Sequence, residues 1–267
     1  GEPGKARPLS GPWQYHVAIR VPEVHDNLKR WNPDRLLRSS RIYNAMIAPL
    51  TPASLAGVIW YQGEADVDRH EDYRELFPEM IRSWRGNWAD PTLPFYFVQL
   101  AGFGEPATRP HFSKWAALRE AQENALKLPD TGMATAVDLG EADDIHPANK
   151  QDVGARLARI ALARDYGQTI PYRNPAAGEV TFGSDTITFE VEHAGPGGLE
   201  ARGPLKHVFA VAGPEREFRW AQASLSGPNT VRVEVPEGIS EPAALRYGWS
   251  RNPRLGLYGS HGLPLLP

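Results

Sequence analysis

Strand-like and helical segments alternate from residue 41 to about residue 170, and this alternation constrains the fold more than any other feature. The strand-like runs read "AGVIWY", "LPFYFVQL" and "GMATAVDL", and helical patterns span 69–86, 113–128 and 147–166. Parallel strands need a long crossover, usually a helix, so this order predicts βαβ units on a parallel sheet. The expected fold class is therefore α/β, with helices on both faces of the sheet.

The first helical segment carries apolar residues at the spacing of one helix face, and these side chains are expected in the core. They are Tyr73, Leu76, Phe77, Met80, Ile81 and Trp84. The last segment has Pro147 at its expected first helical position and Gly167 just after its end.

From residue 176 the apolar pattern changes to period two, which is typical of strands with one buried face. The stretch "EVTFGSDTITFEVE" predicts two strands around a Gly-Ser-Asp turn, and "LKHVFAVAG", "TVRVEVP" and "AALRYGWS" continue the series. We expect residues 176–267 to form a small all-β sandwich and residues 41–175 to belong to the sheet domain. Residues 1–40 are expected to be a linker or the edge of a preceding domain.

Composition and charge exclude several classes of protein. The 267 residues carry a formal net charge of -3, and the 29 Lys and Arg residues are scattered, so no nucleic-acid partner is expected and neutral ligands such as sugars fit better. The chain contains no cysteine, which excludes disulfides, thiolate zinc sites and a cysteine nucleophile. No apolar run reaches the length of a membrane span, so no membrane partner is expected.

Chemistry-bearing residues gather where two of the strand-like runs end. In "VIWYQGEADVDR" the apolar run stops at Gln62, Gly63 and Glu64, and in "DLGEADDIHPANK" the third run gives way to four acids and His146. The carboxyl ends of parallel strands meet at one edge of a sheet, and open α/β sheets bind their ligands there. We therefore expect the two segments to form one site.

His146 is the candidate general base, and an aspartate just before it could orient its ring. Asp143, three residues earlier, or Asp144, two residues earlier, could accept a hydrogen bond from one ring nitrogen and fix the tautomer. The spacing does not choose between them. The alternative is purely structural, with an aspartate that caps the helix and a histidine that is hydrogen-bonded within the fold.

The polar residues that end the first strand-like run could also have purely structural roles. Gln62 could bond a neighbouring loop through its amide, and Glu64 could accept backbone N–H groups of the next turn. Four further acids are expected to interact with the positive end of a helix dipole: Asp66, Asp68, Glu71 and Asp72.

Five segments carry a family resemblance: "RIYNAMIAPLTPASLAGVIWYQGEADV", "FYFVQLAGF", "WAALREAQENAL", "DDIHPANKQDVGARLARIAL" and "LRYGWSRNPRLGLYGSHGLPLLP". The chain resembles the sialate O-acetylesterase family of carbohydrate esterases, within the SGNH hydrolase superfamily, over about residues 40–267. The resemblance implies a flavodoxin-like hydrolase sheet and removal of acetyl groups from sugar hydroxyls without a metal. It also implies a secreted or periplasmic protein.

The resemblance also implies roles for single residues. His146 is the general base, the Asp-x-x-His spacing of the superfamily favours Asp143 as its partner, and Gln62 with Gly63 belongs to the block that lines the oxyanion site. Glu64 is expected to brace the loop. Relatives often carry Asn at the position of Asp66, which puts a role for that carboxylate in doubt.

The chain departs from the family in its nucleophile. The family's serine lies in a Gly-Gln-Ser-Asn type motif near the start of the hydrolase domain, and neither that motif nor the early glycine block is present. No serine follows an apolar strand with a glycine-containing elbow among Ser10, Ser39, Ser40, Ser54, Ser83 and Ser113. Three strands are also fewer than the roughly five of such a sheet. The chain is therefore expected to be the carboxyl-terminal portion of an esterase, either truncated or cut into two associated chains, whose amino-terminal chain carries the serine.

Three functions remain open. The leading one is the base-bearing half of a carbohydrate O-acetylesterase acting on sialate or on a plant polysaccharide such as xyloglucan or xylan. The second is a non-catalytic carbohydrate-binding or scaffold fragment, in which Trp249 and Tyr258 could stack on sugars, although core packing is their commoner use. The third is a metal hydrolase that uses Glu64, Asp143, Asp144 and His146, although no second histidine lies nearby. No metal and no cofactor are expected.

Overall fold

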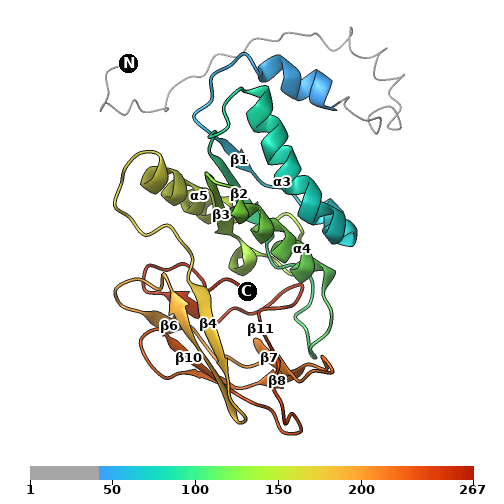
Figure 1. Ribbon diagram of the computed structural model, residues 1–267, viewed down its shortest axis with the longest axis vertical. Coiled ribbons are helices and arrows are strands. Elements are labelled where there is room, and N and C mark those ends of the chain that lie inside the picture. Colours follow the sequence, from blue (N-terminus) through green and yellow to red (C-terminus); the bar gives the residue numbers. More distant parts are fainter. Residues whose placement is uncertain (1–41) are drawn as a thin grey trace. The chain divides into compact units, whose positions relative to one another are not determined.

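The computed structural model describes residues 42–267, and the expectation for residues 1–40 lies outside this range. Residues 42–53 belong to a unit separate from Ser54–Pro267. The first contains two short helical turns, η1 (Tyr43–Ile47) and η2 (Ala48–Leu50). The second contains the parallel sheet and the β-rich region (Figure 1).

The parallel sheet has the strand order β1-β2-β3, formed by Val58–Trp60, Phe95–Gln99 and Thr131–Thr135. All five residues of the central strand, β2, are buried, as expected of a strand covered on both faces. Both pairings are parallel, so the three carboxyl ends lie at one edge. The predicted parallel α/β sheet is thus confirmed.

Helices cover both faces of the sheet (Figure 1). Alternate residues of β2 point to opposite sides, so each face of the strand presents apolar side chains to a helix. Phe95 and Phe97 pack with residues of α3 (His70–Asn87) and α4 (Lys114–Glu123). Tyr96 and Val98 pack with α5 (Lys150–Arg164). Shorter turns accompany them: η3 (Glu64–Arg69), η4 (Asn124–Lys127) and η5 (Val137–Leu139).

Two details of the helices differ from the prediction. Leu76 is 57% exposed, because it lies at the margin of the apolar stripe, whereas Phe77 and Ile81 face the sheet. The last helix begins at Lys150 rather than Pro147, because the Asn149 side chain caps it by accepting a hydrogen bond from the Asp152 N–H at 3.1 Å. Pro147 is buried in the preceding loop.

The chain after residue 175 is antiparallel throughout. One sheet has the order β4-β5-β10-β9, with strands Ala176–Phe182, Thr186–Glu192, Thr230–Glu234 and Ala223–Leu225. A second has the order β11-β7-β8, with strands Ala244–Tyr247, Phe209–Ala212 and Arg219–Ala221. The pair β12 (Leu257–Gly259) and β6 (Leu199–Ala201) forms the third.

Side chains from all three antiparallel sheets share one core, among them Phe189, Phe209 and Leu257. The β4–β5 hairpin turns at 183–185, the predicted Gly-Ser-Asp stretch. An all-β region after the α/β region is therefore confirmed. None of the helices in residues 42–267 combines the length and apolar character needed to cross a membrane.

Candidate functional site

The loop after β1 is held in place by a glutamine of α4. The side-chain oxygen of Gln122 accepts from the Leu100 N–H at 2.9 Å, and its nitrogen donates to the carbonyls of Gln62 and Val98, each at 3.2 Å. A Cβ on Gly63 would lie 3.2 Å from that same nitrogen, and Gly63 has a φ of +151°. Glycine at this position therefore lets the backbone pass close to α4.

The Gln62 side chain points back to its own loop. Its amide nitrogen donates to Asp66 Oδ2 at 2.6 Å, which fixes the amide orientation. An amide nitrogen carries two hydrogens, so one remains for another acceptor. The carboxylate of Asp66 is thus a positioning group for Gln62.

Glu64 begins the turn η3, and within the described chain its carboxylate forms no ion pair and no hydrogen bond.

Tyr61, at the end of the first apolar run, has a shifted pKa. Burial raises the pKa of the Tyr61 hydroxyl to about 12, and the negative charge of Glu64 adds to the shift. Tyr61 is therefore a neutral, partly buried phenol that packs against both core clusters of the sheet, with the Lys150 ammonium 5.1 Å from its ring centre.

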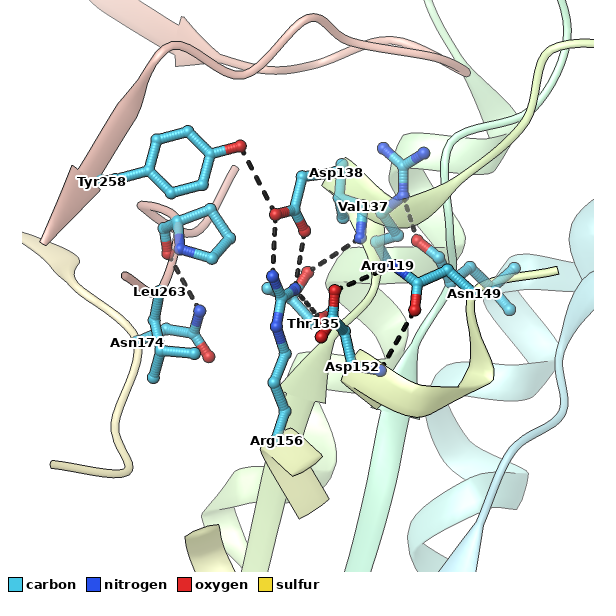
Figure 2. A network of polar contacts seen from close by, with 12 residues as sticks. Arg119, Thr135, Val137, Asp138, Asn149, Asp152, Arg156, Asn174, Tyr258 and Leu263 are labelled. Atoms are coloured by element: carbon cyan, nitrogen blue, oxygen red, sulfur yellow. Dashed lines mark hydrogen bonds and ion pairs between the residues drawn. The ribbon is translucent and has the colours of Figure 1, made fainter. Parts of the chain in front are cut away.

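Two of the four acidic residues in the loop after β3 hold the loop in place. Asp138 makes a bidentate ion pair with Arg156 of α5, at 2.6 and 2.8 Å, and accepts a longer hydrogen bond from the Tyr258 hydroxyl at 3.4 Å (Figure 2). Glu141 Oε1 accepts the Ala148 N–H at 2.6 Å, seven residues on. These two contacts fix both ends of the segment that carries His146.

His146 lies on the open side of this loop, with 88% of its side chain exposed. Asp144 Oδ1 accepts the His146 backbone N–H at 2.8 Å and lies 3.6 Å from the ring nitrogen Nδ1. Asp143 is exposed, and among the described residues its carboxylate has no hydrogen bond or ion pair. The distance from Asp144 to the ring is longer than a hydrogen bond, so the orienting carboxylate stays a prediction.

The loop after β2, residues 100–113, is braced by the tail that follows β11. Asn252 donates to the Gly104 carbonyl at 2.6 Å, and Arg119 of α4 donates to the carbonyls of Ser250 and Arg251 at 2.9 and 2.6 Å. Complete burial lowers the pKa of Arg119 to about 9, and its acceptors are backbone carbonyls. The β-rich region thus helps to hold the loops at the carboxyl edge of the sheet.

All these loops meet in one open cleft of about 480 Å³ at the carboxyl edge. It is lined by Glu64 after β1, by Phe112 after β2, by Ile145 after β3 and by Arg251 from the tail. The structure therefore brings Glu64 next to the segment that carries His146. Within residues 42–267 no hydrogen bond or ion pair joins Gln62 to His146, and no cluster of three or more His, Asp or Glu residues suited to a metal ion occurs.

Sequence reasoning missed Gln122, Arg119 and Arg251. Gln122 and Arg119 are polar residues on the buried face of α4, three positions apart. Polar residues within an apolar stripe could have identified them from the sequence. Arg251 carries no local signal, because its neighbours come from the distant loop after β2 and from α4.

Comparison with known proteins shows the family to which the chain belongs. Residues 23–163 match the family described as carbohydrate esterase, sialic acid-specific acetylesterase. Sialate O-acetylesterase of Mus musculus is 30% identical over 244 residues, and that of Homo sapiens is 27% identical over 240 residues. Each alignment covers 81% of this chain but only 43% and 45% of the respective relative, so the chain spans less than half their length.

A solved structure of a carbohydrate esterase is also similar to this chain. The crystal structure of a novel carbohydrate acetylesterase from Xanthomonas citri is 40% identical, with a TM-score of 0.77, and the match covers 84% of this chain and 52% of that one. The family match extends over more than half of this chain. The chain therefore belongs to the sialic acid-specific acetylesterase family of carbohydrate esterases.

Proposed function

We propose that this chain is the base-bearing part of a carbohydrate O-acetylesterase that works by serine–histidine acyl transfer. The observation that carries the proposal is the exposed His146 beside Asp144 at the carboxyl edge of a parallel sheet, in a chain of a carbohydrate esterase family. The proposed substrate is an acetylated carbohydrate, either sialate or a plant polysaccharide such as xyloglucan or xylan. We also propose a secreted or periplasmic location.

In the proposed mechanism a serine hydroxyl attacks the acetyl carbonyl carbon while His146 accepts the hydroxyl proton. The resulting oxyanion accepts hydrogen bonds from backbone N–H groups and from the second amide hydrogen of Gln62. The bond from the acyl carbon to the sugar oxygen then breaks, and His146 returns the proton to that oxygen. Water repeats the sequence and releases acetate.

We propose that the serine comes from an amino-terminal polypeptide of the same esterase. In the described chain, Ser113 caps α4 by accepting the Ala116 N–H at 3.2 Å, and Ser260 Oγ accepts the Gly197 N–H at 3.1 Å. Both hydroxyls thus serve the fold. Ser10, Ser39 and Ser40 lie outside the described residues, and their sequence context lacks a strand and glycine elbow.

The free edge of β1 is where we propose that this polypeptide binds. Among the described strands β1 pairs only with β2, and Ile59 on it is 70% exposed. An unpaired apolar edge strand normally has a partner or a cover. We propose contacts around residues 41–64 and 132–147, over an area above about 2,000 Å². In this proposal residues 41–175 complete a hydrolase domain and residues 176–267 form a separate sandwich.

The test is acetate release by the natively purified protein from acetylated sialic acid, xyloglucan and xylan fragments. We expect release from at least one substrate that survives EDTA and stops after treatment with a serine-directed inhibitor. Loss with EDTA that added metal restores would favour a metal hydrolase. Binding of the deacetylated glycans without any acetate release would favour a non-catalytic carbohydrate-binding fragment.

A further inference from the structure

A cavity of about 700 Å³ lies at the amino end of β3, and neither Gln62 nor His146 lines it. The cavity extends from Glu123 of α4, on one face of the sheet, to Ile160 and Arg164 of α5 on the other. Its walls therefore cross the free edge of the sheet, because β3 pairs only with β2 among the described strands. The volume is within the range of cavities that bind small ligands.

The hydrogen bonds between β2 and β3 use the even-numbered residues of this edge segment. The Asp130 carbonyl accepts the Phe95 N–H at 2.9 Å, and the Ala136 N–H donates to the Gln99 carbonyl at 3.0 Å. The peptide groups of successive residues point to opposite sides of a strand. The odd-numbered residues of β3 therefore direct their N–H and carbonyl groups to the free edge.

Two arginines of α5 leave one residue open at this edge. Arg164 donates to the Thr131 carbonyl, and Arg156 donates to the Thr135 carbonyl at 2.6 Å. Between them, the N–H and the carbonyl of Met133 have no hydrogen-bond partner within residues 42–267, although Met133 is only 7% exposed. Unpaired peptide groups away from water cost free energy, so this position favours a ligand that supplies one donor and one acceptor.

Two opposite charges in the cavity lack an ion-pair partner among the described residues. Glu123 has no ion pair and no hydrogen bond there, and burial raises the pKa of its carboxyl group. Arg173 contacts Nε2 of His193 at 3.3 Å, but no carboxylate of the described chain pairs with it. The third charged side chain, Arg164, already has the Asp130 carboxylate at 3.8 Å. The cavity thus presents one carboxyl group and one guanidinium to a ligand.

Apolar side chains line the cavity on both sides of the edge. Leu128 and Leu266 pack against the core on the α3 and α4 side of the sheet, and Ile160 belongs to the core on the α5 side. Consecutive side chains of an extended peptide point to opposite faces. A peptide aligned with β3 would therefore place its side chains on these two walls in turn.

We propose that this cavity binds a short apolar peptide with free termini, which extends the sheet at Met133. One residue of the peptide donates to the Met133 carbonyl and accepts from the Met133 N–H, its amino terminus pairs with Glu123, and its carboxyl terminus pairs with Arg173. Because only one residue of the edge is open, the ligand is a peptide of about three residues rather than a long strand. The inference does not depend on the proposed function, since none of these residues belongs to the ester-hydrolysis site.

The first experiment measures binding of the tripeptide Leu-Ala-Leu to the natively purified protein by titration calorimetry, with free termini and with an acetylated amino and amidated carboxyl terminus. We expect the free form to bind about tenfold or more tightly than the capped form. Glu123→Gln and Arg173→Gln should each remove most of that difference. Glu179→Gln and Arg254→Gln, which change exposed residues outside the cavity, are the matched controls and should leave it unchanged. No binding, or equal affinity for the two forms, would overturn the proposal.

The second experiment tests the contact with β3 by NMR of protein labelled with carbon-13 at the methionine methyl groups. The chain has three methionines, Met46, Met80 and Met133, and the signal that disappears in Met133→Leu is that of Met133. We expect Leu-Ala-Leu to shift this signal and to leave that of Met80, in α3, unchanged. The same peptide with a methylated central nitrogen cannot donate to the Met133 carbonyl and should bind about tenfold more weakly. Binding without a shift of the Met133 signal, or equal binding of the two peptides, would contradict pairing with this edge.

Discussion

Asp138 and Arg156 form a bidentate ion pair with side chains only 9% and 11% exposed, and this pair joins the turn η5, which follows β3, to α5 (Figure 2). Arg156 also donates to the Thr135 carbonyl at 2.6 Å. The pair therefore ties the His146 loop to the sheet.

Removing one member of this pair leaves the other charge buried and unpaired. Asp138→Ala should lower the free energy of unfolding by about 3 kcal/mol or more, measured by urea denaturation. Glu79→Ala is the control, because it breaks an ion pair with Arg82 whose side chains are 65% and 53% exposed, and it should cost less than about 1 kcal/mol. Equal losses in the two variants would show that burial of the Asp138 pair has no such effect.

The two aspartates before His146 should differ in their effects. Asp144 accepts the His146 N–H, so Asp144→Ala should disturb the turn and lower stability. Asp143 has no hydrogen bond or ion pair among the described residues, and the family spacing favours it as the partner of the imidazole. We therefore predict that Asp143→Ala lowers kcat about a hundredfold or more without a change in stability. Activity assays and thermal unfolding of both variants check this. Equal mild effects on kcat would mean that a backbone carbonyl orients the ring.

Gln62 should act on the transition state rather than on substrate binding. Gln62→Ala should raise the barrier by roughly 2 to 4 kcal/mol, seen as a lower kcat with little change in KM. Asp66→Ala should also lower kcat because it releases the amide, whereas Asp66→Asn keeps an acceptor oxygen and should retain most activity. Full turnover in Gln62→Ala would limit the amide to loop packing.

Glu123 gives a pH dependence that does not involve the active site. Burial, with a contribution from the charge of Glu120, raises the pKa of Glu123 in the folded chain. The folded state therefore loses stability as the pH rises from the unfolded pKa, about 4.3, through the folded pKa. Glu123→Gln should raise Tm at pH 7, and the gain should vanish below about pH 4, where both states are protonated. The control Glu179→Gln, on the exposed side of β4, should show no such gain. A gain that is equal at both pH values would contradict a titration of Glu123.

The sequence predicted the layers of the fold because apolar periodicity records burial directly. The continuous apolar run "LPFYFVQL" became a strand that is buried on both faces, with Phe95 and Phe97 on one face and Tyr96 and Val98 on the other. The predicted start of α5 at Pro147 is wrong. Proline at a first helical position is only a preference, whereas the Asn149 side chain makes the capping hydrogen bond that fixes the start at Lys150.

The site was predicted only in part, because sequence shows which residues end a strand but not what contacts them. Gln62, Glu64 and His146 follow strands, as the sequence indicated. Arg251 reaches the cleft through contacts between segments more than a hundred residues apart, such as the bonds of Arg119 to the carbonyls of Ser250 and Arg251. No local pattern encodes such pairs.

Active-site labelling with a fluorophosphonate, followed by intact-mass analysis and peptide mapping of the natively purified protein, tests the central proposal most directly. We predict that the label is found on a serine of a second polypeptide, and that His146→Ala slows labelling about a thousandfold, since the histidine activates the serine. Label on one of the serines of this chain, in a preparation that contains no other polypeptide and is esterolytic, would contradict it.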